Sequence, residues 1–143
     1  MSNGAEKIAP KAISVIELHD ATLVCLRVLA GGEVIVRLDD VSVYRPLAAG
    51  VEDVWVHAAK LSMSGVTSVL VEGIWTKADD DYVLDDRVTD HLGETVRWLD
   101  LSAAELQQIH LHLFSGARIV VNCSRAALKL ARKGKVVRQW RKS

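Results

Sequence analysis

Apolar and polar residues alternate along most of the chain, with the period of two that is typical of β-strands. The first three runs of this kind are rich in Val, Ile and Leu: Ile13–Leu18, Thr22–Ala30 and Glu33–Val43. Gly31 and Gly32 separate the second run from the third. Because two glycines allow the positive φ of a tight turn, we predict a β-hairpin here. Asp39 and Asp40 interrupt the third run and indicate a β-bulge or the end of one strand pairing.

The strand pattern continues after a loop predicted at Pro46–Gly50. The runs Val54–Ala58 and Leu61–Met63 keep the alternation but change phase across Ala59-Lys60. A phase change inside a strand indicates a second bulge. A further strand is predicted at Val66–Trp75.

The middle of the chain is more polar. Thr76–Asp90 is rich in aspartate and is too polar for a buried strand, so we expect an exposed loop around a short edge strand. Strand character resumes at Glu94–Leu101, with Val96 and Trp98 on one side.

The next segment fits two structures. Ser102–Glu105 has the capping-box pattern that starts helices, whereas Ile109–Leu113 alternates like a strand. We favour one helical turn at Ser102–Glu105, followed by a hairpin over residues 107–123. A helix over residues 103–115 is the alternative. A last strand is predicted at Leu128–Ala131.

Short strands at spacings of about 8–12 residues describe an all-β domain, an antiparallel sandwich or partly open barrel of about eight strands. A chain of 143 residues suits one such domain. We expect a flexible N-terminal arm at residues 1–12, a single β domain at residues 13–131 and a basic C-terminal tail at residues 132–143. An exposed sheet edge would also allow a homodimer.

The formal net charge of zero hides an asymmetry along the chain. Residues 125–143 contain eight basic side chains and no acidic one, which leaves ten basic and 18 acidic side chains in residues 1–124. Ten of those acids lie between Glu72 and Glu105. The sequence therefore predicts a negative middle and a positive end.

The two cysteines, Cys25 and Cys123, each sit in an apolar run. They are predicted to be buried free thiols of a cytoplasmic protein, with a disulfide between them as the alternative. The sequence has no apolar stretch long enough to span a membrane and no secretion signal, which also favours the cytoplasm.

The acidic region suggests a cationic protein partner, because charge complementarity accelerates association and selects partners. Aromatic residues inside a polar rim are common binding hot spots. The residues that we expect at this contact combine carboxylates with aromatic rings: Trp75, Asp79, Asp80, Asp81, Tyr82, Asp85 and Asp86. The alternative is that Trp75 and Trp98 belong to the core.

Two further hypotheses use other residues. On a strand, His110 and His112 would point to one face about 6.5–7 Å apart, close enough to share a zinc ion; they would otherwise form the polar face of that strand. The basic tail could bind nucleic acid or an anionic surface through cations and one aromatic ring: Arg132, Lys133, Lys135, Arg138, Trp140, Arg141 and Lys142.

No catalytic motif stands in the sequence: it has no glycine-rich phosphate loop and no CxxC, HExxH or GxSxG pattern. We therefore expect a protein without enzymatic activity and without a cofactor.

The segment Ile16-Glu17-Leu18-His19-Asp20-Ala21, followed by a Gly-Gly hairpin and further Val-rich strands, resembles small bacterial β proteins of unassigned role. Some proteins of this type are immunity proteins of toxin–immunity systems. The resemblance covers residues 13–75. It implies that the chain neutralises a cationic toxin, such as a nuclease.

Overall fold

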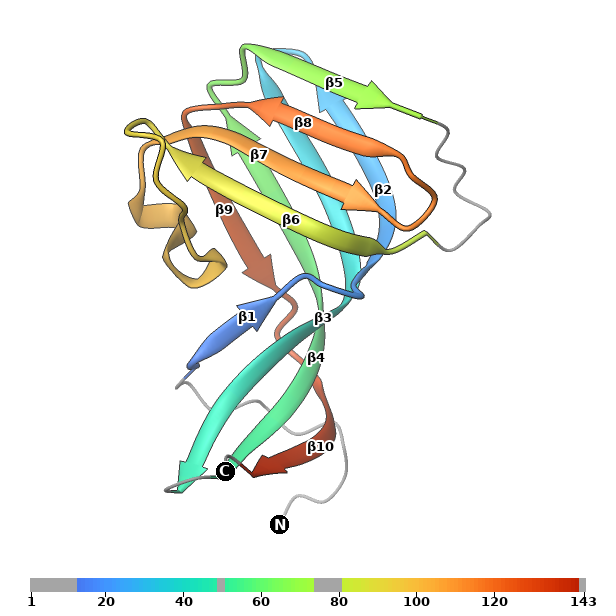
Figure 1. Cartoon of the computed structure of the whole chain (residues 1–143), viewed down its shortest axis with the longest axis vertical. Helices are drawn as coiled ribbons and strands as arrows, with labels where there is room; N and C mark the ends of the chain where they lie inside the picture. The colour runs from blue at the N-terminus through green and yellow to red at the C-terminus, as the bar shows by residue number, and fades with distance from the viewer. Residues whose placement is uncertain (1–12, 49–50, 74–80, 142–143) are drawn as a thin grey trace.

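The computed structural model describes residues 13–48, 51–73 and 81–141 (Figure 1). Within these ranges the chain forms ten strands and one short 3₁₀ helix, in this order: β1 Val15–Glu17, β2 Thr22–Leu29, β3 Glu33–Ala48, β4 Val51–Ser64, β5 Ser68–Glu72, β6 Val83–Asp90, η2 Trp98–Ala103, β7 Leu106–Leu113, β8 Arg118–Asn122, β9 Arg125–Leu130 and β10 Lys135–Arg141.

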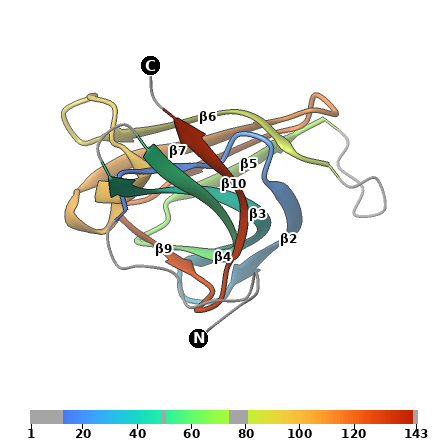
Figure 2. The same cartoon turned by 90° about the horizontal axis from the view of Figure 1, so that it is seen from below.

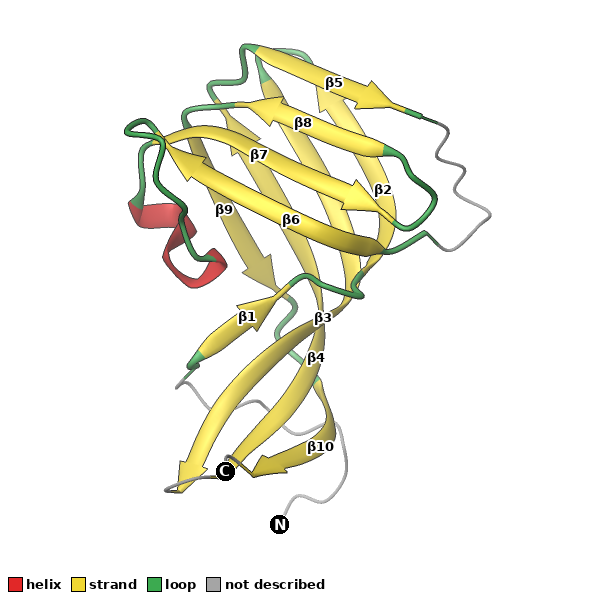
Figure 3. Ribbon diagram, viewed as in Figure 1, coloured by secondary structure: helices red, strands yellow, loops and turns green. Residues whose placement is uncertain are grey.

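The strands form two antiparallel sheets that lie against each other (Figures 1 and 2). The large sheet has the order β1-β3-β4-β10, with β2 added beside β3 and β9 beside β4. The small sheet has the order β5-β8-β7-β6. This arrangement confirms the all-β prediction, with ten strands in the described residues rather than about eight. Figure 3 draws η2 in red, beside the yellow strands.

The long strands β3 and β4 belong to both halves of the molecule. In the sandwich, the first half of β3 pairs with β2 and the second half of β4 pairs with β9. The other halves of β3 and β4 continue beyond the sandwich, where β3 pairs with β1 and β4 pairs with β10 (Figure 1). The predicted bulge lies where the two halves meet: the register shifts between Leu38 and Val41, and Asp40 has a φ of 59°. The extra residue keeps both Leu38 and Val41 buried on one side of a strand that bends.

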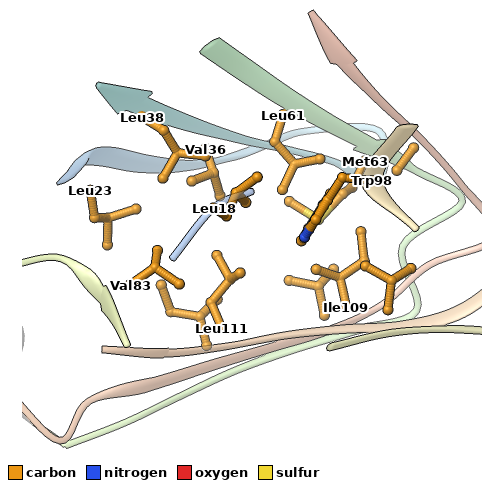
Figure 4. Close-up of a cluster of buried hydrophobic side chains, with 14 of the residues drawn as sticks. Leu18, Leu23, Val36, Leu38, Leu61, Met63, Val83, Trp98, Ile109 and Leu111 are labelled. Carbon is orange, nitrogen blue, oxygen red and sulfur yellow. The ribbon is translucent and has the colours of Figure 1, made fainter. Parts of the chain in front are cut away.

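The core lies between the two sheets. Leu38, Leu61 and Met63 of the large sheet point toward Ile109 and Leu111 of the small sheet (Figure 4). Burial of these alternating residues explains the period of two in the sequence.

The predicted hairpins are confirmed. Gly31 and Gly32 join β2 to β3 with φ values of 90° and 81°. Strands β7 and β8 form the hairpin predicted over residues 107–123, so the alternative helix over residues 103–115 is wrong. Its alternating residues Ile109, Leu111 and Leu113 are all buried against the core.

Two predictions for the first half of the chain are wrong. No loop starts at Pro46: β3 continues to Ala48, and Pro46 pairs with Glu52. A shift of register just after Pro46 accommodates a residue that has no N–H to donate. There is also no bulge at Ala59-Lys60, where β4 keeps a regular register with β3. The change of phase reflects Val54 and Trp55, which are adjacent and both buried, because this part of β4 is covered on both faces.

The predictions for the middle of the chain are partly wrong. An edge strand is present within Thr76–Asp90 as predicted, but this strand, β6, has eight residues and buries Val83 and Val88. The strand predicted at Glu94–Leu101 is replaced by a single bridge at Thr95 and then by η2. Trp98 and Leu101 are both buried, and their spacing of three residues matches one turn of a 3₁₀ helix.

The last part of the chain adds two strands to the large sheet. The strand predicted at Leu128–Ala131 is present as β9, Arg125–Leu130, paired with β4. Residues 135–141 of the expected basic tail form β10, which pairs with the other half of β4. Most of the basic segment is therefore held in a sheet.

Candidate functional site

The structure describes four of the seven residues that we predicted to contact a partner. Trp75, Asp79 and Asp80 lie outside the described residues. The other four lie on β6 or directly before it: Asp81, Tyr82, Asp85 and Asp86.

Asp81 is a structural residue. It is only 4% exposed, and its carboxylate accepts hydrogen bonds from the Ser115 hydroxyl at 2.5 Å, the Ser115 N–H at 3.0 Å and the Tyr82 N–H at 3.1 Å. These bonds hold the turn between β7 and β8 against the start of β6. The prediction that Asp81 lies on an exposed face is therefore wrong, because its carboxylate is buried and is hydrogen-bonded to the turn.

An exposed apolar cluster lies beside this turn. The rings of Tyr82 and Phe114 stack with centroids 4.7 Å apart and an angle of 16° between their planes. Phe114 is 62% exposed and Leu84 is 42% exposed. We call Tyr82, Leu84 and Phe114 the aromatic corner. Phe114 was not among the predicted contact residues, because only the pairing of β6 with β7 brings it to Tyr82.

Four carboxylates lie on β1, the β1–β2 turn and β6, and we call Glu17, Asp20, Asp85 and Asp86 the acidic edge. Asp86 interacts electrostatically with both Asp85 and Glu17. The backbone joins the two groups, since Asp20 N–H donates to Val83 O at 2.8 Å.

Asp86 differs from the other acids of this edge. The indole N–H of Trp98 donates to its carboxylate at 2.5 Å. Burial raises the pKa of Asp86, against the lowering effect of the Trp98 hydrogen bond. Trp98 itself is only 8% exposed and belongs to the core, as the alternative interpretation proposed.

The two predicted metal ligands share a face, but the face does not suit a metal ion. His110 and His112 lie on the outer side of β7, opposite Arg87 and Asp85 of β6. The Nε2 atom of His110 accepts a hydrogen bond from Arg118 at 3.2 Å, which occupies a lone pair that a metal would need. Burial and the nearby Arg118 lower the pKa of His110. Across the described residues no group of three potential ligands is close enough to hold a metal.

Both cysteines are free thiols, so the alternative of a disulfide is wrong. Cys123 is buried, and burial raises the pKa of its thiol to about 11. Cys25 is half-buried on β2.

A buried polar cluster that sequence analysis missed lies where the two halves of the molecule meet. The imidazole of His57 lies 3.2 Å from Arg45 Nη2 through Nε2 and 2.9 Å from Ala131 O through Nδ1. The guanidinium of Arg45 lies over the Trp55 ring, 5.8 Å from its centroid. Burial lowers the pKa of His57. Both ring nitrogens are engaged, so His57 holds the fold together at this point and is not placed as a general base.

The predicted basic tail is only partly a separate segment. Arg132 and Lys133 are exposed between β9 and β10, and Lys135 is the exposed first residue of β10. Arg138, Trp140 and Arg141 belong to strand β10, and Lys142 lies outside the described residues.

Strand pairing brings further cations to this part of the large sheet. Lys60 of β4 stands directly between Arg37 of β3 and Lys129 of β9. Sequence analysis missed Arg37 and Lys60, although each is the polar residue between two buried apolar ones, the pattern that places a side chain on the outer face of a strand.

Comparison with protein-family models, curated proteins and solved structures finds no match. None of the helices in the described part of the chain is long and apolar enough to cross a membrane.

Proposed function

We propose that this protein is a non-enzymatic interaction module that binds a cationic protein partner through the aromatic corner and the acidic edge. The supporting observation is the stacked pair of Tyr82 and Phe114: the Phe114 ring is 62% exposed, and the strand that follows Tyr82 carries the exposed Asp85.

Each part of this surface has a separate role in the proposal. An exposed aromatic ring supplies a large apolar contact at little cost in conformational entropy, so the corner provides affinity. The carboxylates of Asp20 and Asp85 are exposed and attract a positive surface over a distance, so the edge provides speed and selectivity.

The concrete form that we propose is an immunity-type protein that neutralises a cationic toxin in the cytosol. A nuclease must carry positive charge to hold its substrate, and an acidic surface complements that charge. The free thiols of Cys25 and Cys123 are compatible with a reducing compartment.

The test is capture of partners by the tagged full-length chain from an extract of its source cells. Four forms are compared: wild type, Phe114→Ala, the double variant Asp20→Lys/Asp85→Lys, and Leu92→Ala. Leu92 is 72% exposed in the turn after β6, so it is a matched control for the loss of an exposed apolar side chain. A stoichiometric basic protein that is retained by wild type and Leu92→Ala but lost from the other two supports the proposal. A partner retained equally by all four forms contradicts it.

The captured protein then allows a kinetic test. Reversal of Asp20 and Asp85 should lower the association rate constant by tenfold or more at about 20 mM salt and by much less at about 200 mM, because salt screens attraction between exposed charges. Phe114→Ala should mainly raise the dissociation rate constant. Equal effects of the charge reversal at both salt concentrations would show that the acidic edge does not steer association.

A further inference from the structure

A line of like charges crosses the outer face of the large sheet. The cross-strand register places Cys25, Arg37, Lys60 and Lys129 side by side on β2, β3, β4 and β9. Their sequence neighbours Val36, Leu61 and Leu130 face the core, so the four side chains point to the other side of the sheet. We call Arg37, Lys60 and Lys129 the cationic row.

Among the described residues, no ion pair joins a carboxylate to Arg37, Lys60 or Lys129. Like charges directly opposite each other on neighbouring strands destabilise a sheet. Three cations in register on adjacent strands are therefore unfavourable for folding alone, and an anionic ligand would compensate them.

The row borders a shallow groove of about 220 Å³. Ala58, Ala59, Leu130 and Ala131 also line the groove, and Arg132 adds a fourth cation. Among the described residues, no aromatic side chain lines it. The groove thus offers positive charge but no ring for a base to stack on.

We propose that the cationic row and Arg132 bind the phosphate backbone of a single-stranded nucleic acid. Adjacent strands of a sheet lie about 4.8 Å apart, so the row is a linear array about 10 Å long, which suits a ligand that carries closely spaced charges along a line. Without an aromatic platform, this binding is independent of base sequence.

A planar anionic membrane fits this face less well than a strand does. Asp39 and Asp40 are exposed in a cleft that adjoins the groove at Ala58, and the exposed Lys133 and Lys135 line the same cleft. A flat lipid surface that approached the row would meet these two carboxylates as well as the cations, so they would oppose part of its attraction, whereas a flexible strand can follow the row and avoid them. The site is separate from the aromatic corner, so this proposal goes beyond the proposed function and does not depend on it.

The first test is the salt dependence of binding to a fluorescent single strand of about 20 thymidines, followed by anisotropy. Each neutralised phosphate contributes about −0.7 to the slope of log K against log salt concentration, so four cations predict a slope of about −3. The double variant Lys60→Gln/Lys129→Gln should make the slope less negative by about 1.4. The double variant Arg87→Gln/Arg118→Gln removes the same charge from the outer face of the small sheet and should leave the slope unchanged.

The second test uses the wild-type chain and so does not depend on the folding of a variant. Cys25 pairs with Arg37 at the end of the row, while Cys123 is buried with a pKa of about 11 and is expected to be unreactive near neutral pH. Saturation with the oligonucleotide should lower the rate of Cys25 alkylation by a neutral reagent, in proportion to the fraction of protein bound. Cys25→Ser confirms that the labelled thiol is Cys25.

Three results would overturn the proposal. The first is no binding of the oligonucleotide at about 20 mM salt. The second is an equal loss of binding in the two double variants, which would show that only the total charge matters. The third is protection of Cys25 by vesicles of mixed phosphatidylserine and phosphatidylcholine but not by the oligonucleotide, which would identify a membrane as the ligand.

Discussion

Asp81 is buried and stabilises a turn, whereas the sequence predicts this single residue at a charged surface. Its carboxylate is buried and accepts three hydrogen bonds, two of them from Ser115. Replacement by alanine leaves those donors without an acceptor, and bonds to charged groups contribute about 1.5–3 kcal/mol. We expect Asp81→Ala to lower the free energy of unfolding by about 2–4 kcal/mol, measured by urea denaturation.

The matched control is Asp85→Ala, four residues along the same segment. Asp85 is exposed, and its carboxylate accepts a bond from the neighbouring Asp86 N–H. Its loss should change the free energy of unfolding by no more than about 0.5 kcal/mol. If the two variants lost the same stability, the Asp81 network would not hold the turn between β7 and β8.

Asp86 gives a second prediction at this scale, in the dependence of stability on pH. Burial is the largest effect on its pKa and raises it. The hydrogen bond from the Trp98 N–H and the nearby His19 lower the pKa, whereas the nearby carboxylates of Asp85 and Glu17 raise it. The folded protein therefore binds this proton more tightly than the unfolded chain does. Protonation of Asp86 therefore contributes favourably to the free energy of unfolding. This contribution is fully present below the pKa of the unfolded chain, about 3.9, and is lost as the pH rises through the raised pKa of the folded protein.

Asp86→Asn removes this titration. The free energy of unfolding of the variant should increase relative to wild type as the pH rises from about 3.5 to 7, in urea denaturation at a series of pH values. A difference between the two proteins that stays constant over this range would show that the pKa of Asp86 is not raised.

The limits of sequence analysis are also visible in single residues. The turn glycines Gly31 and Gly32 and the bulge at Asp39 and Asp40 act through the local backbone, so the sequence predicts them correctly. Asp81 binds Ser115, which is 34 residues away. No local pattern reports such a partner, so Asp81 was wrongly placed among the exposed acids.

At the scale of strands, the alternation of apolar residues predicts β2, β3, β7 and β8 well, because one face of each is buried. It fails for the first half of β4, which is covered on both faces, and for β6, an edge strand of the small sheet that carries several acids. The order of strands is not encoded in this pattern at all. That order creates the cationic row and brings Phe114 to Tyr82, and both were therefore missed.

The cationic row leads to a prediction about the sheet itself. Lys60 lies directly between Arg37 and Lys129, so Lys60→Glu replaces two like-charge pairs by two opposite-charge pairs. Cross-strand pairs contribute about 0.2–1 kcal/mol each. We expect the free energy of unfolding to rise by about 0.5–1 kcal/mol at low salt while oligonucleotide binding falls.

The control for this variant is Arg27→Glu on β2, which is separated from β4 by β3. Arg27 pairs with Ile35 rather than with a cation, so its reversal should change the free energy of unfolding less. A loss of stability in Lys60→Glu equal to that in Arg27→Glu would show that repulsion within the row does not affect folding.

At the scale of the whole molecule, the sequence predicts a negative middle and a positive end, but the fold gathers charges from other parts of the chain as well. Arg37 and Lys60 stand beside Lys129 of the positive end, and Asp86 of the negative middle interacts with Glu17. The cationic row lies on the outer face of the large sheet, and the acidic edge lies on β6 of the small sheet and around β1. The formal net charge is zero at pH 7. Repulsion between whole molecules is therefore weak, and the two charged surfaces can attract each other between copies.

We expect this polarity to cause weak head-to-tail association that salt reverses. Attraction between exposed charges reaches about 30 Å at 0.01 M salt and about 10 Å at 0.1 M. In sedimentation equilibrium, the weight-average mass should exceed the monomer value of 15.7 kDa at about 0.01 M salt and return to it at about 0.3 M.

Both Lys60→Glu/Lys129→Glu and Asp20→Lys/Asp85→Lys should remain monomeric at low salt, because each removes one of the two complementary surfaces. Arg87→Glu/Arg97→Glu shifts the net charge as far as the first pair but leaves the row intact, so it should still associate. Association that persists at 0.3 M salt would point instead to the exposed apolar side chains of the aromatic corner.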